Sequence, residues 1–312
     1  MNAELLLMFT LGRDRAYLYG HPEHELTSEE RLRYDDALAQ RSRGIPAQYI
    51  TGHQEFWGMD LIVSAAVLIP RPETEHVVET VLGLIGDKSV STGHVGRTFL
   101  SDQSLPDPSI LKRSTDALRI VDIGTGSGSI ALALAKELLQ AEIHATDISP
   151  AALEIARANA ARLQLESRIK FHEADLLAGI ERSAFDFVVS NPPYVGESEE
   201  DSVQLEVRKF EPRNAVFAGP TGLEVIERLI PQAREVLKPG GWLVIEISGT
   251  IAARIQELLT GWNNVEITND LQGIARVAAA QKMSRDHRGS QLTTKSGEEL
   301  NNFAPNLSIL HD

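Results

Sequence analysis

The stretch LRIVDIGTGSG, residues 118–128, decides the fold of this chain. Its first six residues are mostly apolar, which is typical of a buried strand in a parallel sheet. Three glycines then alternate with small polar residues, and such a turn lets the backbone leave a strand sharply and approach a ligand closely. Residues 129–140 are rich in Ala and Leu and predict a helix. This order of strand, turn and helix predicts an α/β domain.

The alternation of strands and helices continues along the chain. Further strands are predicted at residues 142–147, 168–172, 185–190, 242–247, 265–267 and 274–280. Further helices are predicted from Pro150 onward and at residues 222–236 and 251–259, with a turn at Pro239-Gly240-Gly241. We therefore expect a doubly wound sheet with right-handed crossovers.

The glycine turn and an acid on the next strand predict a ligand that contains adenosine. Asp147 ends the strand at 142–147, about 20 residues after the turn, where a carboxylate can accept both ribose hydroxyls. A dinucleotide site prefers the spacing G-x-G-x-x-G, whereas this turn has G-x-G-x-G. The tighter spacing suits S-adenosyl-L-methionine, which has no pyrophosphate. We expect this cofactor to contact the whole turn, Gly124, Thr125, Gly126, Ser127 and Gly128.

Three further residues are candidates for the same cofactor site. Asp122, two residues before the first glycine, is placed to reach the ammonium group of the cofactor, directly or through water. Asp175 follows the strand at 168–172 and is placed to meet the adenine amine, with Leu176 against the ring face. An Asp before two leucines can equally cap a short helix, so two interpretations of Asp175 stay open.

The tetrapeptide Asn191-Pro192-Pro193-Tyr194 follows the strand at 185–190 and predicts the catalytic site. Two prolines can continue neither a strand ladder nor a helix, so the chain leaves the strand in a rigid turn. The Asn191 side-chain oxygen and the Pro192 carbonyl can accept the two N–H bonds of a planar NH2 group. Tyr194 would form a flat wall against that group, and Asn191 would also border the cofactor. The alternative is an ordinary surface turn, since N-P and P-P are common turn dipeptides.

The predicted cofactor site, which would hold the methyl donor, and the predicted site for a planar NH2 group, which would accept the methyl, together predict methyl transfer to nitrogen. An amide nitrogen held about 3–3.5 Å from an electrophilic methyl carbon is positioned for in-line displacement. Because the donor is already activated, we expect no metal ion and no covalent intermediate. No residue stands out as a general base, and the proton can leave to water.

Composition and charge exclude several classes of protein. The formal net charge of −14 argues against direct binding of nucleic acid, which requires a basic surface. Cysteine is absent, which excludes disulfides, thiol nucleophiles and Cys-based metal sites. No apolar run approaches the roughly 18 residues that a membrane span needs. We expect a cytoplasmic protein, and the sequence does not specify its oligomeric state.

The N-terminal segments do not show the alternation of strands and helices that is predicted for the α/β domain. Residues 1–50 have a helical pattern, with a capping box predicted at Thr27 and Glu30. Residues 56–63 predict a hairpin, and the LIPRPETE segment at 68–75 predicts a stiff connector, because each proline restricts the residue before it.

The role of the connector stays open between two interpretations. Its charged residues Arg71, Glu73 and Glu75 are candidates for the lip of a pocket, and a rigid hinge between domains explains the segment equally well. Residues 86–117 and the tail from 284 are polar with little periodicity and predict disorder.

These motifs resemble the peptide chain release factor N5-glutamine methyltransferases (HemK/PrmC type) over roughly residues 1–283. Besides the glycine turn and Asn191–Tyr194, the resemblance rests on PAQYITG at 46–52 and on LIPRPETE at 68–75. The Asn-Pro-Pro-Tyr motif is shared with adenine-N6 methyltransferases, whereas the connector is more specific. In place of the Trp that family members often carry after Asp175, this chain has Leu176.

The resemblance implies a domain plan and an activity. It implies a helical substrate-recognition domain at 1–53, a hairpin linker and connector at 54–76, and a seven-stranded, Rossmann-like class I methyltransferase domain at 77–283. The insertion at 86–117 lies within that last domain, and the tail spans 284–312. It also implies that Gly124–Gly128 and Asp147 bind the methyl donor, while Asn191–Tyr194 hold the glutamine amide of a Gly-Gly-Gln loop in release factors.

Three alternatives compete with this function. Methylation of a glutamine in a ribosomal protein uses the same chemistry with a different recognition domain. Adenine-N6 methylation of nucleic acid would need a basic groove and aromatic platforms, which the charge and the 5% aromatic content disfavour. A non-catalytic binding module would have no need of both an intact glycine turn and Asn191.

Overall fold

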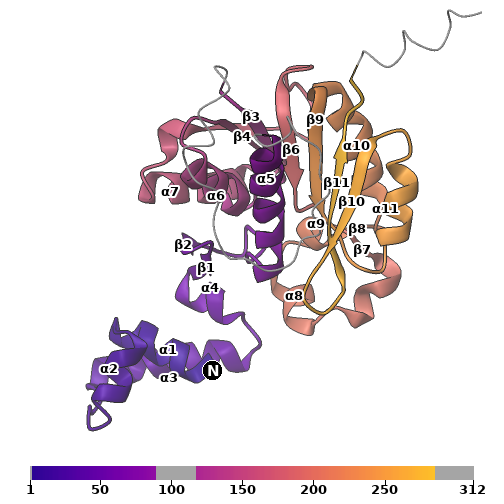
Figure 1. Cartoon of the computed structure of the whole chain (residues 1–312). Coiled ribbons are helices and arrows are strands. Elements are labelled where there is room, and N and C mark those ends of the chain that lie inside the picture. The colour runs from indigo at the N-terminus through magenta and orange to yellow at the C-terminus, as the bar shows by residue number, and fades with distance from the viewer. Residues whose placement is uncertain (1, 89–116, 285–312) are drawn as a thin grey trace, which may run out of the picture.

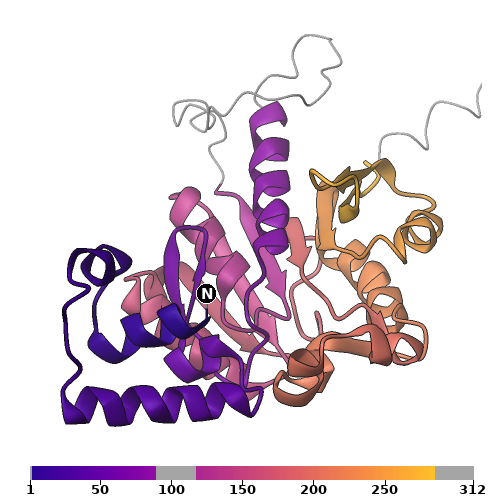
Figure 2. The same cartoon turned by 90° about the horizontal axis from the view of Figure 1, so that it is seen from below.

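The computed structural model describes residues 2–88 and 117–284 of the 312-residue chain (Figure 1). The disorder predicted from residue 86 is wrong for residues 86–88, which continue a helix, α5 (Glu75–Lys88); the rest of the predicted insertion up to residue 116 and the tail after residue 284 lie outside the described residues. The N-terminal helices form a lobe to one side of a larger sheet domain. A short helix and a hairpin lie between the two (Figures 1 and 2).

A seven-stranded sheet forms the larger domain and confirms the doubly wound α/β prediction. Its order is β10-β11-β9-β6-β3-β4-β5, and β11 runs antiparallel to both neighbours while the other pairs are parallel. The strands are β3 (Arg119–Ile123), β4 (Glu142–Asp147), β5 (Ile169–Glu173), β6 (Phe185–Ser190), β9 (Leu237–Glu246), β10 (Asn263–Asn269) and β11 (Ala275–Gln281). The strand order reverses between β3 and β6, and open sheets bind ligands at the carboxyl ends of such strands.

Helices cover both faces of the sheet, which explains why the central strands β3, β6 and β9 are mostly buried, whereas the edge strand β10 is mostly exposed. In β9, Trp242 and Val244 pack into one hydrophobic core, whereas Leu243 and Ile245 pack into the other. Successive side chains of a strand point to opposite faces, so this alternation marks a sheet buried on both sides. The first core is covered by α5 (Glu75–Lys88), α6 (Ser129–Glu137) and α7 (Pro150–Arg162), and the second by α10 (Glu224–Val236) and α11 (Ala252–Leu258).

Four helices form the N-terminal part of the chain: α1 (Asn2–Leu11), α2 (Arg15–Gly20), α3 (Ser28–Ser42) and α4 (Ala47–Thr51). The capping box predicted for α3 is confirmed. The Thr27 hydroxyl accepts the Glu30 N–H at 3.2 Å, and the Glu30 carboxylate accepts the Thr27 N–H at 2.9 Å. The two bonds satisfy backbone donors that would otherwise have no partner at the helix start.

The predicted hairpin is present and is tied to the glycine turn. It consists of β1 (His53–Phe56) and β2 (Met59–Ile62), joined at Trp57 and Gly58, which both have positive φ, the backbone pattern of a tight hairpin turn. The buried Asn159 of α7 accepts the Ile62 N–H at 2.7 Å and donates to the Ile62 carbonyl at 3.0 Å. Its amide also donates to the Ser127 carbonyl at 2.9 Å, so one side chain fixes the hairpin against the turn.

The structure adds short elements that the sequence pattern did not predict. They are η1 (Pro72–Thr74), η3 (Glu166–Arg168), β7 (Val195–Gly196), η4 (Glu197–Ser202), α8 (Leu205–Phe210), α9 (Arg213–Val216) and β8 (Phe217–Gly219). The turn predicted at Pro239-Gly240-Gly241 is instead part of β9, because the Gly240 N–H pairs with the Lys282 carbonyl at 2.9 Å. The helix predicted to reach residue 140 ends at Glu137.

Candidate active site

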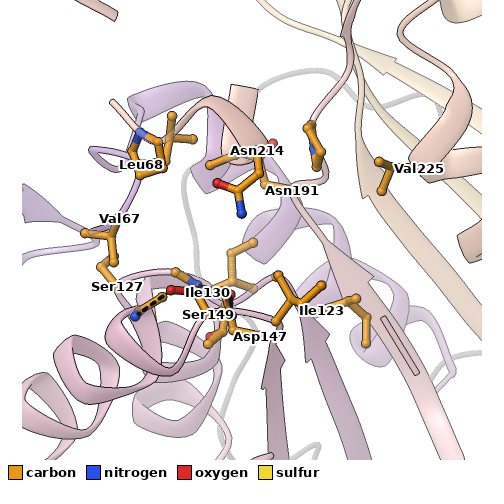
Figure 3. Close-up of a pocket in the computed structure, with 18 of the residues that line it drawn as sticks. Val67, Leu68, Ile123, Ser127, Ile130, Asp147, Ser149, Asn191, Asn214 and Val225 are labelled. Atoms are coloured by element: carbon orange, nitrogen blue, oxygen red, sulfur yellow. Dashed lines mark hydrogen bonds between the residues drawn. The ribbon is translucent and has the colours of Figure 1, made fainter. Parts of the chain in front are cut away.

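A cavity of about 310 Å³ opens at the carboxyl ends of β3, β4 and β6 (Figure 3). The glycine turn, the end of β4, the loop after β5 and the turn after β6 contribute to its wall. Three segments from outside the strand ends complete it, namely residues from the stretch 66–74 at and before the connector, the region around α9, and the start of α10 at Val225 and Arg228. The cavity therefore brings together the donor and acceptor motifs that the sequence separates.

The glycine turn forms one wall through backbone that other residues cannot adopt easily. Gly124, Gly126 and Gly128 all have positive φ, between +56° and +85°. At Gly128 a side chain would also meet Leu132 and Ala156, whose atoms lie 3.1 and 3.3 Å from the position of a Cβ. Left-handed φ and close packing thus both require glycine there. Of the turn, Gly124, Thr125, Gly126 and Ser127 line the cavity, while Gly128 lies behind it as the N-cap of α6.

Asp147 lies on the cavity wall with its carboxylate fixed by backbone donors. One oxygen accepts the Gly126 N–H and the other accepts the Ser149 N–H, both at 2.9 Å. Burial raises the pKa of this carboxyl, and the backbone bonds oppose that shift. Each carboxylate oxygen keeps a second lone pair, so the group can still accept hydroxyl donors from a ligand.

Asp122 lies below the glycine turn and is not part of the cavity wall. It accepts the Thr125 hydroxyl at 2.6 Å and the Ala131 N–H at 3.2 Å. Burial raises the pKa of Asp122 to about 7, and its second oxygen has no hydrogen-bond partner among the described residues. Thr125 does line the cavity, so the contact between Asp122 and the wall runs through that hydroxyl.

Asp175 and Leu176 both line the cavity at the loop after β5. This loop forms turns, and no helix begins at Asp175. The prediction that Asp175 caps a short helix is therefore wrong. The Asp175 carboxylate pairs with Arg228 of α10, and both side chains are about half exposed. Leu176 has a positive φ, and its carbonyl accepts the Thr146 hydroxyl at 2.9 Å.

The turn after β6 places only part of its motif at the cavity. Asn191 and Pro193 line it, whereas the buried Pro192 and the largely buried Tyr194 do not. The Tyr194 hydroxyl donates to Glu246 at 2.9 Å, and burial beside that carboxylate raises the pKa of the phenol. Tyr194 therefore packs behind the turn, which differs from the predicted wall facing the substrate.

The Asn191 side chain is held through its amide nitrogen, while its amide oxygen has no partner among the described residues. Its Nδ2 donates to the Thr74 hydroxyl at 3.0 Å, and Thr74 in turn donates to Glu246 at 2.6 Å. No donor among the described residues bonds the Asn191 Oδ1, which leaves that oxygen available to a ligand.

The charged residues of the connector make structural contacts away from the cavity. Arg71 pairs with the buried Glu211 at 2.6 Å, and Glu75 accepts the Trp57 N–H at 2.8 Å. Neither lines the cavity, and neither does Glu73, so the lip interpretation of this segment is not what the structure shows. Apolar and hydroxyl residues of this stretch line the wall instead, notably Val67 and Leu68 (Figure 3). Thr74 lines it as well.

Among the polar residues at or behind the cavity that the sequence analysis did not predict are Thr74, Glu246 and Asn214. Thr74 lies within the connector, Glu246 near the end of an apolar strand, and Asn214 on the short helix α9, where its side chain lies at the cavity (Figure 3). A carboxylate inside the apolar run of β9 was the one available signal, since a buried acid needs partners. Nothing in the sequence around Asn214 marks it as a cavity residue.

Comparison with known proteins agrees with this geometry. Residues 1–52 match the family described as PrmC N-terminal domain, and residues 109–209 match the Methyltransferase small domain. The release factor glutamine methyltransferase of Koribacter versatilis is 50% identical over 283 residues, covering 90% of this chain and 91% of the relative. The chain belongs to the release factor glutamine methyltransferase family. The member from Rhodopirellula baltica is 36% identical over 90% of this chain and 89% of its own length.

Solved structures place the family fold among class I methyltransferases. The hMettl16 catalytic domain in complex with MAT2A 3'UTR hairpin 6 aligns with a TM-score of 0.54 at 18% identity, covering 88% of this chain and 94% of that one. At that identity the likeness concerns the fold alone. Across residues 2–88 and 117–284, no helix has the length and hydropathy that crossing a membrane requires.

The cofactor of this methyltransferase family is S-adenosylmethionine, and the cavity fits it. A fixed carboxylate, Asp147, stands at the end of the second strand, and the tight glycine backbone leaves room for a ligand beside it. Apolar side chains of Val67 and Ile130 (Figure 3), together with Leu176, form walls that suit the adenine and the carbon chain next to the sulfur.

Proposed function

We propose that this chain transfers the methyl group of S-adenosylmethionine to the side-chain amide nitrogen (N5) of the glutamine in the Gly-Gly-Gln motif of peptide chain release factors. The observation that carries the proposal is the Asn191 carboxamide. Its nitrogen is fixed to Thr74 and its oxygen is free at the cavity that also holds Asp147 and the glycine turn. An amide with a free oxygen is the group that holds the NH2 of another amide.

The residues of the chain divide the work of methyl transfer. Bound S-adenosylmethionine supplies an activated methyl group. The glycine turn Gly124–Gly128 and Asp147 hold the donor, with Asp175 and Leu176 at its adenine end, and Asp122 supports the turn through Thr125.

Asn191 would orient the glutamine amide and stabilise the positive charge that develops on its nitrogen. An amide nitrogen is a poor nucleophile because its lone pair is delocalised, so orientation and charge stabilisation must provide most of the acceleration. The Asn191 oxygen accepts one N–H of the substrate, and we assign the second to the Pro192 carbonyl. The new N–C bond would form as the methyl–sulfur bond of the donor breaks, with the sulfur leaving as a neutral thioether, and the nitrogen would lose one proton to water.

The N-terminal segment is the proposed recognition domain. We assign residues 1–53, whose described part contains the helices α1 to α4, to substrate recognition, residues 54–76 to the hairpin linker and connector, and residues 77–283 to the methyltransferase domain. A protein substrate that acts in translation termination would place the enzyme in the cytoplasm. The net charge of −14 favours a protein surface over bare nucleic acid as the direct partner.

A methylation assay tests the substrate. The enzyme with labelled donor should transfer the label to a release factor and not to its Gly-Gly-Glu variant, in which a carboxylate replaces the amide. A ribosomal protein with an accessible glutamine, and an adenine-containing DNA or RNA strand, serve as the competing substrates. Equal labelling of the Gly-Gly-Glu variant, or preference for either competitor, would overturn the proposal.

A further inference from the structure

A buried chain of hydrogen bonds connects Asn191 to the last strand of the parallel sheet. Asn191 Nδ2 donates to Thr74 Oγ1 at 3.0 Å, and Thr74 Oγ1 donates to Glu246 Oε2 at 2.6 Å. The other oxygen of Glu246 accepts the Tyr194 hydroxyl at 2.9 Å. Thr74 and Glu246 are each only 2% exposed, so water does not compete for these bonds.

The Thr74 hydroxyl has one proton, and its use determines which end of Asn191 it can bind. Because that proton is donated to Glu246, the Thr74 oxygen can only accept from its other neighbour. Asn191 must then present its NH2 group to Thr74, since two acceptor oxygens cannot form a hydrogen bond with each other. The carboxamide of Asn191 is therefore held with its NH2 group toward Thr74 and its oxygen pointing away from Thr74.

The reverse orientation would disable the site. If Thr74 donated its proton to Asn191, the carboxamide could turn by 180° and present its NH2 group to the substrate. Two NH2 groups would then face each other, and the glutamine nitrogen would have no acceptor from this side chain. Asparagine oxygen and nitrogen have nearly the same shape, so packing alone does not select one orientation.

We propose that Glu246 is a positioning residue for methyl transfer, which acts through Thr74 to hold the Asn191 carboxamide with its oxygen toward the substrate amide. This inference rests on the proposed function, because it concerns the geometry of the acceptor site. Glu246 itself does not line the cavity and touches neither substrate nor cofactor.

The surroundings of Glu246 match this role. Burial raises the pKa of Glu246, while the hydroxyls of Thr74 and Tyr194 lower it, and both hydroxyls donate to the carboxyl. A carboxylate that accepts two donors is the ionised form, since a protonated acid would have to donate one of those bonds. The charge of Glu73 raises the pKa of Glu246 further, and the charge of Arg276 opposes that shift.

Two substitutions separate positioning from general damage to the fold. Glu246→Gln keeps the shape but offers an NH2 group, which can donate to Thr74 and free the threonine proton for Asn191. Thr74→Val removes the hydroxyl at nearly constant volume, and Thr74→Ser keeps it. Thr80→Val is the matched control, because the Thr80 hydroxyl of α5 donates to a helix carbonyl and does not line the cavity.

The measurement is kcat and KM for a release factor, with calorimetric Kd for S-adenosylmethionine and the unfolding midpoint of each variant. We expect kcat to fall at least about 10-fold in Glu246→Gln and Thr74→Val, with the donor Kd within about 2-fold of wild type. Thr74→Ser should restore kcat to within about 3-fold, and Thr80→Val should match wild type.

The outcomes distinguish this inference from the proposed function. If the wild-type chain does not methylate the release factor, the proposed function fails. If the wild type is active and a folded Glu246→Gln or Thr74→Val protein keeps its kcat, the positioning role fails. The role also fails if Thr74→Ser is as inactive as Thr74→Val, or if donor affinity falls in parallel with kcat, since either result indicates only a structural contribution.

Discussion

The two halves of the cavity are built in opposite ways. The donor half is local: the Gly126 N–H and the Asp147 carboxylate that meet there are 21 residues apart, on adjacent parallel strands. The acceptor half is assembled from distant segments, because Asn191 meets Thr74 across 117 residues and Thr74 meets Glu246 across 172. Binding of the donor thus depends mainly on the segments that follow β3, β4 and β5, with Val67 as the distant contribution, whereas orientation of the acceptor depends on the whole fold.

Among the predicted substitutions, we expect the largest loss of kcat at Asn191, in the acceptor half of the cavity. Asn191→Ala removes the acceptor for the substrate amide and should lower kcat by about 100- to 1,000-fold, the usual loss for one preorganised transition-state contact. The donor Kd should stay nearly unchanged, because the donor half is intact. Single-turnover methylation of a release factor, with calorimetry of donor binding, checks both values. Equal losses of kcat and donor affinity would contradict the division into halves.

The opposite pattern is expected at Asp147. Asp147→Ala should weaken donor binding by about 10- to 100-fold, because it removes a fixed ionic acceptor and leaves the Gly126 and Ser149 N–H groups unpaired. At saturating donor, kcat should recover most of its value. Calorimetric titration measures the Kd, and Asp147→Asn, which keeps one oxygen acceptor, should lose less. An unchanged Kd for the alanine variant would remove Asp147 from the donor site.

The glycine turn tests how closely the donor half is packed. Gly128→Ala should reduce the free energy of unfolding by about 2–3 kcal/mol, because a positive φ and a contact of 3.1 Å with Leu132 act together. Gly179→Ala is the matched control, since it has a positive φ of +79° with no atom near its Cβ position, and it should cost about 1 kcal/mol. Urea unfolding measures the difference, and equal losses would show that backbone strain alone governs the turn.

Asp122 gives the smallest expected effect, a dependence of stability on pH. Burial raises its pKa from 3.8 to about 7 in the folded chain, so the folded state binds a proton that the unfolded state has already released. The contribution of this group to the free energy of unfolding therefore falls as the pH rises from about 4 to 7.

Asp122→Asn removes this titration and isolates its share of the profile. The stability of the variant relative to wild type should increase between pH 5 and pH 7.5, measured by urea unfolding without donor. A constant difference across that range would mean that the folded chain keeps Asp122 ionised.

The contrast between the halves also explains which residues sequence reasoning recovered. Asp147, the glycine turn, Asp175 and Leu176 all occupy or border the cavity because each follows a strand whose position is set by hydrophobic periodicity. Asn191 was recovered for the same reason. Thr74 and Asn214 follow no strand, so no pattern linked them to the site.

Tyr194 shows that a sequence motif can predict a turn without predicting which of its side chains face the cavity. The tetrapeptide predicted a rigid turn after β6, and the turn is there. Which of its side chains faces the cavity depends on what lies behind it, and Glu246 provides a buried acceptor for the phenol. Sequence alone does not contain that partner, because β9 approaches the turn only after the sheet has formed.

The sequence by itself determined the α/β fold, the family and the donor site, because hydrophobic periodicity and a glycine turn act within about 30 residues of chain. The tertiary structure decided the acceptor geometry: the clamp of Asn159 on the hairpin, the position of Tyr194 and the bonds from Asn191 through Thr74 to Glu246. A side-chain hydrogen bond requires two groups within about 3 Å, and for these residues, which lie 52 to 172 positions apart, only the completed sheet supplies that proximity.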